Sequence, residues 1–454
     1  MQRVNKWKGK DCGTTVDRTE NAYREIYLLM KALMFNYSIP RIALKKIGLG
    51  DDFFLMKFSN AWPLPRIAYP NQVLVKTHLG GICGSDLHQM RVTMSLYASI
   101  MSCPVNPIPM GHEVMGVVSE VGQAVSGLQP GDRVVYNPVN RCSFYGFEPC
   151  PSCRNGNYQH CFCLLGIGDG TDRERTYGGR HKFGGFGGGG FGEYLLGFEQ
   201  QFHRVPDNIP DEVAVLAEPF TIALHAASRH MPKDNDTVVV VGAGIIGLLT
   251  VKALRALGSQ CRIISLARYP VQAMTALKLG ATEVISERDT KKLYDRISVA
   301  TGGSLFSPLF SKRVLYGNKG PDVIFDCVAS ESSVDDDLRL VRSNGKVVLI
   351  GLDFNITKNV DWSLAVWKEI EVSGTIFSGR EFCEAHEVDA FDLALDLIAR
   401  DPGGYSGLVS HLFPIEQYHQ AFACMYAKKK QNAIKVVLDF RQDARMVHQP
   451  ITAG

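Results

Sequence analysis

The sequence feature that most limits which folds this chain can adopt is a glycine-rich turn, GAGIIG, at residues 242–247. It follows directly on an apolar run at 238–241 and leads into a segment with helical spacing. Between a strand and a helix, such glycines allow a tight turn, a close approach to a pyrophosphate and close helix–strand packing. The helix N-terminus adds N–H donors. This context predicts a dinucleotide-binding fold, although the bare pattern also fits a glycine-rich turn in any α/β protein.

The chain has 454 residues, which is more than a single hydrophobic core usually holds. The sequence pattern on either side of the glycine turn divides it into domains. Over 220–377, the apolar runs TVVVVG, CRIISLA, TEVIS, PDVIFDC and GKVVLIG alternate with helical segments, which predicts an α/β, doubly wound parallel sheet. Residues 30–219 alternate short apolar runs with glycine and proline, the pattern of a mostly β domain. We expect 378–440 to fold back onto that domain, with 1–29 as an extension and 441–454 as a tail.

The charge balance narrows the class of partner. The 49 Lys and Arg residues against 46 Asp and Glu leave a net charge of +3 without long runs of one sign, so no surface for nucleic acid or an anionic membrane is expected. No stretch approaches the roughly 18 apolar residues of a membrane span, and a secretory signal pattern is missing. We expect a cytoplasmic protein with a small-molecule partner, in which some of the 12 cysteines bind metal.

Residues with the chemistry of zinc ligands occur in the first domain. Cys83 lies in GICGSDLH, His112 and Glu113 lie in MGHEVMG, and Glu218 in LAEPFTIALHA is placed where the two domains are expected to meet. Thiolate, imidazole and carboxylate are donors that zinc takes in proteins. Each also has a simpler explanation, because a lone buried cysteine usually packs as a small hydrophobic residue and a lone GHE is usually a polar surface turn.

In this order, the motifs resemble those of the zinc-dependent medium-chain alcohol and polyol dehydrogenases. The resemblance covers roughly 30–440 and rests on GICGSDLH, GHEVMGVVSEVG, GDRVV, CPSCRNGNYQHC, FGEYLL, EPFTIALHA, VVGAGIIGLLTVKALRALG and KLGATEVI. It implies a GroES-like, mostly β catalytic domain, a Rossmann cofactor domain and a catalytic zinc. Glu218 stands where alcohol dehydrogenases have a second cysteine, as in the branch resembling sorbitol, threonine and glucose dehydrogenases. The implied ligands are Cys83 and His112 with Glu218 or Glu113, and the choice between the glutamates stays open.

The same resemblance implies roles for the other side chains of GICGSDLH. Ser85 would hydrogen-bond the substrate oxygen on zinc, His88 would be the outlet of a proton relay, and Asp86 would orient the zinc-bound imidazole. Zinc would lower the pKa of a bound alcohol, its proton would leave through Ser85 toward His88, and a hydride would pass to the nicotinamide. The alternative is an incidental cluster of polar residues in a turn.

A second, structural zinc is implied by four cysteines. Cys150-x2-Cys153-x7-Cys161 keeps the spacing of the family's cysteine lobe, and a Cys₄ zinc would order a loop too polar to fold by burial. The first spacing departs from the family, because the seven residues SFYGFEP separate Cys142 from Cys150 where Cys-x2-Cys is usual. Cys163 as a substitute ligand and an empty site are the alternatives.

Cofactor contacts are expected along the glycine turn and at the ends of two strands, at Gly242, Gly244, Ile245, Ile246, Gly247, Ala267, Arg268, Ile350 and Gly351. In dinucleotide folds an acidic residue at the end of the second strand holds the ribose 2′-OH. Ala267 takes this position and Arg268 follows, similar to the GSRP segment of NADP-using relatives. We therefore expect a preference for NADP over NAD. The alternative is that Arg268 stacks on adenine or points to solvent, and that both cofactors are accepted.

These features predict a zinc-dependent oxidoreductase that transfers a hydride between an alcohol or polyol, or the matching aldehyde or ketone, and NAD(P). The alternatives are a zinc-free quinone or enone reductase, which should lack Cys83 and His112, and a catalytically idle zinc-binding sensor. The run LAVWKEIEVSGTIF is expected to form a sheet edge that pairs in a homodimer or homotetramer. Insertions at 89–110 and 164–191 belong to loops that often set specificity, and the glycine run 184–192 favours a flexible linker over a substrate lid.

Overall fold

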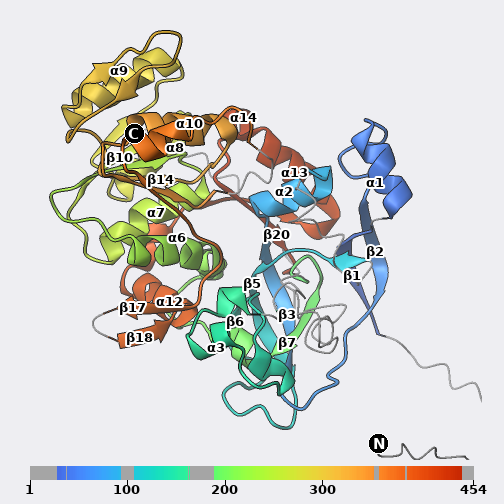
Figure 1. Cartoon of the computed structure of the whole chain (residues 1–454). Helices are drawn as coiled ribbons and strands as arrows, with labels where there is room; N and C mark the ends of the chain where they lie inside the picture. Colours follow the sequence, from blue (N-terminus) through green and yellow to red (C-terminus); the bar gives the residue numbers. More distant parts are fainter. Residues whose placement is uncertain are drawn as a thin grey trace, which may run out of the picture.

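The computed structural model describes residues 28–36, 38–93, 107–161, 163, 189–351, 357–383 and 386–441. Two large sheets organise these residues, one of six strands and one of seven. Figure 1 shows the six-stranded sheet with its helices at the upper left and the seven-stranded sheet at the lower right, with helix α6 (Ala217–Arg229) between them. We refer to the two parts as the cofactor half and the catalytic half.

The cofactor half alternates strands and helices. Its elements are β9 (Thr237–Val241), α7 (Ile245–Ala256), β10 (Arg262–Leu266), α8 (Pro270–Lys278), β11 (Glu283–Ile285), α9 (Thr290–Thr301), β12 (Leu305–Phe306), β13 (Val314–Leu315), β14 (Val323–Asp326), α10 (Glu331–Leu340), β15 (Lys346–Leu349), α11 (Ser363–Trp367) and β16 (Glu371–Gly374). The sheet has the order β11-β10-β9-β14-β15-β16 with all pairings parallel, which is the Rossmann order. Ligands bind such sheets where the order reverses, here at the ends of β9 and β14.

The catalytic half is mostly antiparallel, and the η labels mark 3₁₀ helices. Its first part contains β1 (Leu29–Phe35), α1 (Ile39–Lys46), β2 (Met56–Pro63), β3 (Gln72–Gly81), α2 (Gly84–Arg91), β4 (Ile108–Pro109), β5 (Glu113–Val121), β6 (Arg133–Tyr136), η2 (Cys142–Tyr145), α3 (Pro151–Arg154), η3 (Tyr158–His160), β7 (Tyr194–Phe198), η4 (Glu199–Gln201), β8 (Phe202–Arg204) and α5 (Asp211–Ala214). The longest strand, β3, is central, because it pairs antiparallel with β5, with β7 and with the last strand of the chain.

The segment after the cofactor half returns to the catalytic half. It contains β17 (Arg380–Cys383), β18 (His386–Asp389), α12 (Ala390–Arg400), η5 (Pro402–Tyr405), β19 (Val409–Pro414), η6 (Ile415–Gln417), α13 (Tyr418–Tyr426), α14 (Lys428–Gln431) and β20 (Lys435–Asp439). Strand β20 lies next to β3, with Val437 opposite Gly81. The last strand therefore folds back onto the first domain, as its apolar run suggested.

Helix α6 joins the two halves. One core cluster contains Phe220 of this helix, Leu79 of β3 and Val240 of β9, so apolar packing continues from one sheet to the other. Toward the end of α6, Nδ1 of His225 lies 2.6 Å from Oε1 of Glu381 in β17, and both side chains are buried. The helix is thus held by its core at one end and by a buried polar pair at the other.

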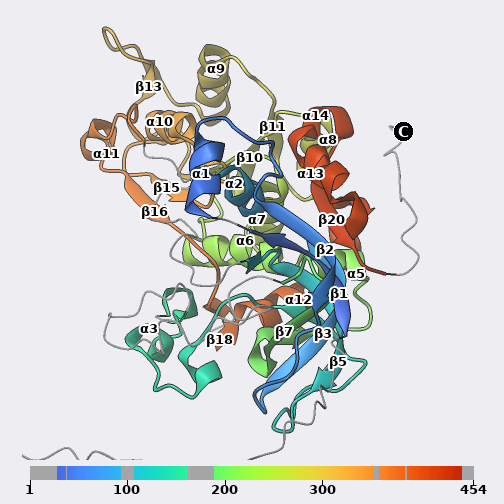
Figure 2. The same cartoon turned by 90° about the vertical axis from the view of Figure 1, so that its right-hand side faces the viewer.

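Helix α1 and the hairpin of β12 and β13 are among the elements that the sequence did not predict. Helix α1 interrupts the connection between β1 and β2, although Ser38 at its N-cap and Pro40 in its first turn are a recognisable start signal. Strands β12 and β13 form a hairpin that projects beyond the helices at the top of Figure 2. Residues 94–106 and 164–188 lie outside the described residues, so the expectations for the two insertions stay untested there. Within the described ranges, every helix is too short or too polar to cross a membrane.

Candidate active site and metal centres

The glycine turn has the backbone geometry that a dinucleotide cradle needs. Gly242 has φ +86°, a left-handed conformation that favours glycine. A Cβ at Gly247 would collide with the carbonyl oxygen of Gly242, so glycine is needed for α7 to start this close to β9. A Cβ at Gly244 would meet nothing within 4 Å, and α7 begins there without a side-chain cap. Open space next to backbone N–H donors fits a bound pyrophosphate.

The other residues expected to contact the cofactor lie around this turn. Ile245 and Ile246 form the first turn of α7 and pack against the core. Ile350 is buried at the end of β15, and a Cβ at Gly351 would collide with the backbone of Val328 after β14. The ends of β9, β14 and β15 therefore meet at one place in the sheet, which is the switch point of the strand order.

The end of β10 carries the residues expected to select the cofactor. Ala267 is buried directly after the strand, and the next residue, Arg268, is exposed. Arg288, after β11, donates from Nη2 to the carbonyl oxygen of Arg268 at 3.4 Å, and its guanidinium carbon lies 5.9 Å from the ring centroid of Tyr269. Two arginines thus stand at the ends of adjacent strands. Sequence reasoning missed Arg288, because its place depends on the pairing of β10 with β11.

Cys83, His112 and Glu113 converge at one end of the catalytic sheet. Their ligand atoms all lie within 4.8 Å of one another. Cys83 is the N-cap of α2, which follows β3, and Glu113 begins β5, so the pairing of β3 with β5 brings the two motifs together. Thiol, imidazole and carboxylate at this separation form a donor set that suits zinc.

A buried lysine that sequence reasoning missed stands against this group. Lys435 of β20 is fully buried, and its Nζ forms an ion pair with Glu113 Oε2 and donates to the carbonyl oxygen of Ile82 at 3.0 Å. A Cβ at Gly81 would collide with the Glu113 carboxylate, so glycine is needed where β3 passes the pair. Because the ammonium neutralises Glu113, a metal ion at this carboxylate competes with Lys435. The sequence signal is the lysine within the apolar run AIKVVL.

Glu218 supplies a second carboxylate from the first turn of α6. It lies outside the set of atoms within 4.8 Å, yet its charge acts on His112. Burial raises the pKa of Glu218 to about 7, against the opposing effect of His112. Burial alone would lower the pKa of His112, but Cys83, Asp86 and Glu218 raise it well above its usual value. A divalent cation bound here would balance the negative charge of these acidic groups.

Asp86 and His88 have partners inside the same motif. Asp86 is buried at the third position of α2, where its Oδ2 accepts the Cys83 N–H at 2.8 Å. Its Oδ1 lies 4.0 Å from His112 Nδ1, too far for a hydrogen bond. His88 Nδ1 lies 2.8 Å from Thr93 Oγ1. Ser85 and His88 are three residues apart in α2, so they share a face of the helix.

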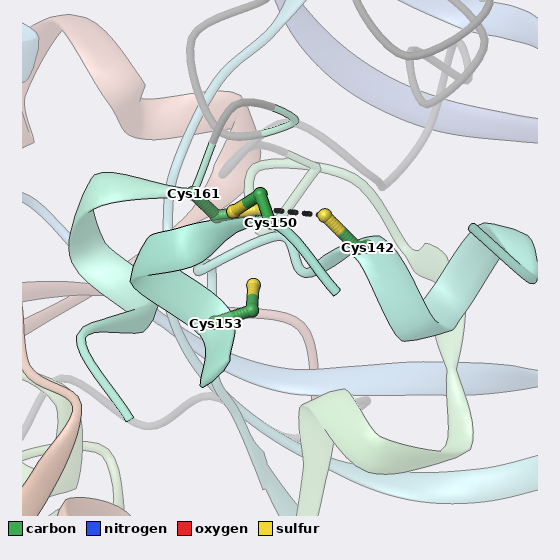
Figure 3. Close-up of side chains that lie close together, drawn as sticks. All are labelled: Cys142, Cys150, Cys153 and Cys161. Carbon is green, nitrogen blue, oxygen red and sulfur yellow. Dashed lines mark hydrogen bonds between the residues drawn. The ribbon is translucent and has the colours of Figure 1, made fainter. Parts of the chain in front are cut away.

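The four cysteines of the predicted lobe form a compact cluster. The sulfurs of Cys142, Cys150, Cys153 and Cys161 all lie within 4.8 Å of one another, and Figure 3 shows them facing a common space. Tetrahedral zinc with Zn–S bonds of about 2.3 Å places its sulfurs roughly 3.8 Å apart, and Cys142 and Cys161 are 3.6 Å apart. The donor set therefore fits a Cys₄ zinc.

The unusual first spacing of this lobe is accommodated by a local turn. Helix η2 begins at Cys142, and Gly146 directly after it has φ +68°. The chain then returns, so that Phe147 N–H donates to the Cys142 carbonyl at 3.1 Å. Cys163 is buried beside the cluster, and its N–H donates to Cys161 Sγ at 3.4 Å. It packs next to the four sulfurs without belonging to the set within 4.8 Å.

Two family models match the chain, the alcohol dehydrogenase GroES-like domain at residues 69–207 and the zinc-binding dehydrogenase at residues 246–395. The chain belongs to the zinc-dependent medium-chain alcohol and polyol dehydrogenase family. The expected combination of a GroES-like domain with a Rossmann domain is confirmed.

Relatives in this dehydrogenase family match over most of their length. Sorbitol dehydrogenase of Homo sapiens is 28% identical over 384 residues, which are 83% of this chain and 91% of that protein. An alcohol dehydrogenase of Escherichia coli CFT073, solved with NADH, has a TM-score of 0.66 at 23% identity, covering 91% of this chain and 99% of that chain. A zinc-binding dehydrogenase of Sinorhizobium meliloti 1021, bound to NADP, has a TM-score of 0.65 at 23% identity with the same coverage. These two structures share the fold.

Proposed function

We propose that the protein is a zinc-dependent oxidoreductase that transfers a hydride between an alcohol or polyol, or the matching carbonyl compound, and NAD(P). The observation that carries this proposal is the convergence of Cys83, His112 and Glu113 within 4.8 Å. When bound, zinc supplies the Lewis acidity that lowers the pKa of an alcohol, and the nicotinamide supplies the hydride acceptor. Cys83 and His112 would hold the metal together with Glu113 or Glu218.

The remaining polar residues would handle the substrate proton. Ser85, in the first turn of α2, would accept the hydroxyl proton of the alcohol, and His88 on the same helix face would carry it outward. The hydrogen bond of His88 to Thr93 fixes the orientation of the imidazole. Asp86 would hold the Cys83 backbone in position by accepting a hydrogen bond from the Cys83 N–H.

The function is tested by metal analysis and a substrate screen. We expect about two zinc ions per chain, one in each cysteine-containing centre, and oxidation of alcohols or polyols with a nicotinamide cofactor. Reduction of quinones or enones by a zinc-free protein would overturn the proposal in favour of the zinc-free reductases. Zinc content without turnover of any alcohol, polyol or carbonyl compound would favour a zinc-binding sensor.

NADP is the proposed cofactor. Ala267 leaves the end of β10 without a repelling carboxylate, and Arg268 and Arg288 offer two guanidinium groups for a 2′-phosphate. The test is steady-state kinetics with both cofactors on the wild type, Arg268→Ala and Ala267→Asp. The preference for NADP should weaken in the first variant and reverse in the second. A wild-type kcat/KM that is higher for NAD would contradict this choice.

A homodimer or homotetramer is the proposed assembly. β16 is the last strand in the sheet order, and α11 before it exposes Val366 by 79% and Trp367 by 73%. An open strand edge next to exposed apolar side chains favours pairing with a second copy. Light scattering at micromolar concentration should give a dimer or tetramer, and a monomer would contradict it. We also propose a cytoplasmic location, since no disulfide joins the cysteines that the structure describes.

A further inference from the structure

A hairpin of the cofactor half exposes several large apolar side chains. Strands β12 and β13 pair antiparallel, and their hairpin projects beyond the helices at the top of Figure 2. At its tip Leu309 is 83% exposed and Phe310 is 100% exposed, and Phe306 of β12 and Tyr316 after β13 are exposed as well. Apolar residues scattered singly over a surface are normal, but a group of them in one hairpin indicates an interaction site.

The hairpin is held in a defined position. Leu315 of β13 is fully buried in a core cluster of the cofactor half. Arg313 Nη1 lies 2.6 Å from Oδ1 of Asp295 in α9, and Lys312 Nζ lies 2.9 Å from Oδ2 of Asp335 in α10. The fold therefore fixes the place at which the apolar tip meets solvent.

The backbone at the tip is a second, independent observation. Phe310 has φ +62°, a left-handed conformation that is unfavourable for a residue with a large side chain. A glycine would relieve this strain and would also remove the exposed ring. Phenylalanine is therefore unfavourable here in both respects for a single chain, which favours a contact that only an assembly provides.

Helix α10 joins the hairpin to the second exposed apolar segment, α11. Arg339 Nη1 donates to the carbonyl oxygen of Lys312 at 3.3 Å, and Arg339 Nη2 lies 3.6 Å from Oδ2 of Asp361, just before α11. The carboxylate of Asp335 pairs with Lys312 and also accepts the Asp361 N–H at 3.2 Å. The hairpin and α11 thus lie on the same side of the cofactor half, as does the edge strand β16 (Figure 2).

The charges around the hairpin favour a protein partner over a membrane. An anionic membrane attracts lysines and arginines whose charges are free, but Lys312 and Arg313 beside the tip are each paired with an aspartate of the same chain. Paired charges also allow two identical surfaces to meet without repulsion between like charges. The surface therefore suits a second copy of this chain.

The exposed area is of the size that a stable dimer needs. At about 200 Å² for each fully exposed aromatic side chain, the aromatic residues of the hairpin and of the α11 segment leave on the order of 700 Å² in water: Phe306, Phe310, Tyr316, Trp362 and Trp367. A standard interface buries about 800 Å² per partner.

We propose that the β12–β13 hairpin is an arm that packs against a second copy of this chain, in addition to the pairing of the β16 edges. The inference rests on the proposed assembly and extends it, because pairing of the sheet edges alone does not require the hairpin. In a two-fold assembly each copy presents the same surface, so the hairpin and α11 of both copies would meet at one interface.

The test is the dissociation constant of the assembly, measured by analytical ultracentrifugation over a dilution series. Leu309→Ser combined with Phe310→Ser should weaken association by about 10- to 100-fold, since two apolar anchors lose their burial. Ile47→Ser at the end of α1, an apolar residue that is 73% exposed on the catalytic half, is the matched control and should leave the constant unchanged.

A second variant separates association from folding. Phe310→Gly suits the left-handed backbone, so it should weaken association while circular dichroism shows an unchanged fold. Wild-type association in both hairpin variants, or an equal loss in Ile47→Ser, would overturn the inference and leave the proposed assembly standing. A wild type that stays monomeric at micromolar concentration would overturn both.

Co-sedimentation with vesicles of phosphatidylcholine and phosphatidylserine tests the other occupant of such a surface. We expect no binding of the wild type to these vesicles. Binding that is lost when Leu309→Ser and Phe310→Ser are combined would assign the hairpin to a membrane and overturn the inference.

Discussion

The two cysteine-containing centres differ in how their donors are supported. In the cysteine lobe, four like donors face one another, and three of the four thiols are buried. Around Cys83, unlike donors meet beside further charged groups: Glu113 pairs with Lys435, the Cys83 N–H donates to Asp86, and Asp86 lies 4.0 Å from His112. A second carboxylate, Glu218, stands nearby.

This difference is the one expected between a structural and a catalytic zinc site. Four thiolates complete the coordination of zinc and leave no position for a substrate, whereas catalytic zinc sites have three protein ligands and an open position. Lys435 competes with a metal for the carboxylate of Glu113, and the carboxylate of Glu218 stands nearby. A metal at this centre therefore has two alternative carboxylate ligands. The comparison thus predicts that substitutions at the Cys83 centre lower activity, whereas substitutions in the cysteine lobe lower stability.

The largest effect is expected for Cys83→Ala. Removal of the thiolate should release the catalytic zinc and lower kcat/KM for alcohol oxidation by about 10³-fold or more, since the metal supplies several kcal/mol to the transition state. The Tm should change little, because the cores of both halves do not depend on this residue. Cys261→Ala, at a buried thiol outside both centres, is the control. Substantial activity in Cys83→Ala would remove the basis for a zinc mechanism.

The reverse result is expected for Cys153→Ser. Loss of one of four thiolates should reduce the zinc content by one ion per chain and lower the Tm by about 5 °C, for a loss of roughly 2 kcal/mol in a domain of this size. The activity per folded molecule should stay close to that of the wild type. Cys163→Ser should keep the zinc content unchanged, and a loss of zinc in this control would make Cys163 the fourth ligand.

The two centres should also differ in how zinc affinity depends on pH. Glu218, with a pKa raised by burial to about 7, and His112, with its raised pKa, must lose protons before they can bind a metal. Affinity at the catalytic centre should therefore rise with pH through 7, by about tenfold per pH unit for each proton released. The pKa values of Cys142 and Cys161 are raised, so the lobe should keep gaining affinity above this range. Zinc titrations of Cys153→Ser and Cys83→Ala measure each centre alone, and parallel pH profiles would count against the distinction.

The smallest effect is expected at the end of the proton path. His88→Ala should lower kcat by about threefold to tenfold, most strongly at low pH, because water replaces the last proton acceptor at some loss of general-base efficiency. Thr93→Val removes only the partner of Nδ1 and should have a weaker effect in the same direction. An unchanged pH–rate profile in His88→Ala would leave this residue without a role in catalysis.

Features that depend on short stretches of sequence were predictable. The glycine turn, the parallel sheet around it and the return of the last strand follow from apolar periodicity and turn residues, and the structure contains all three. The four cysteines were also expected to cluster, although the first spacing was unusual. The glycine turn and the four cysteines each depend on residues that lie close together in the sequence.

Residues that depend on contacts between distant segments were missed. Lys435 reaches Glu113 only because β20 pairs with β3, and β3 with β5, across more than 300 residues of chain. Arg288 reaches Arg268 only through the pairing of β10 with β11. Helix α1 had a start signal, but a segment of eight residues is too short for helical periodicity to be distinguished from a loop.

Helix α6 has a consequence for how variants of this protein should be interpreted. Glu218 lies in its first turn and His225 lies two turns later in the same helix. Glu381 anchors the far end of this helix through its contact with His225. A substitution at Glu381 would leave His225 buried without its partner and would shift helix α6, which carries Glu218. In a survey of tolerated changes, Glu381 would therefore be as intolerant as a residue that touches the metal, and distance from the reaction would be a poor guide to which variants are harmless.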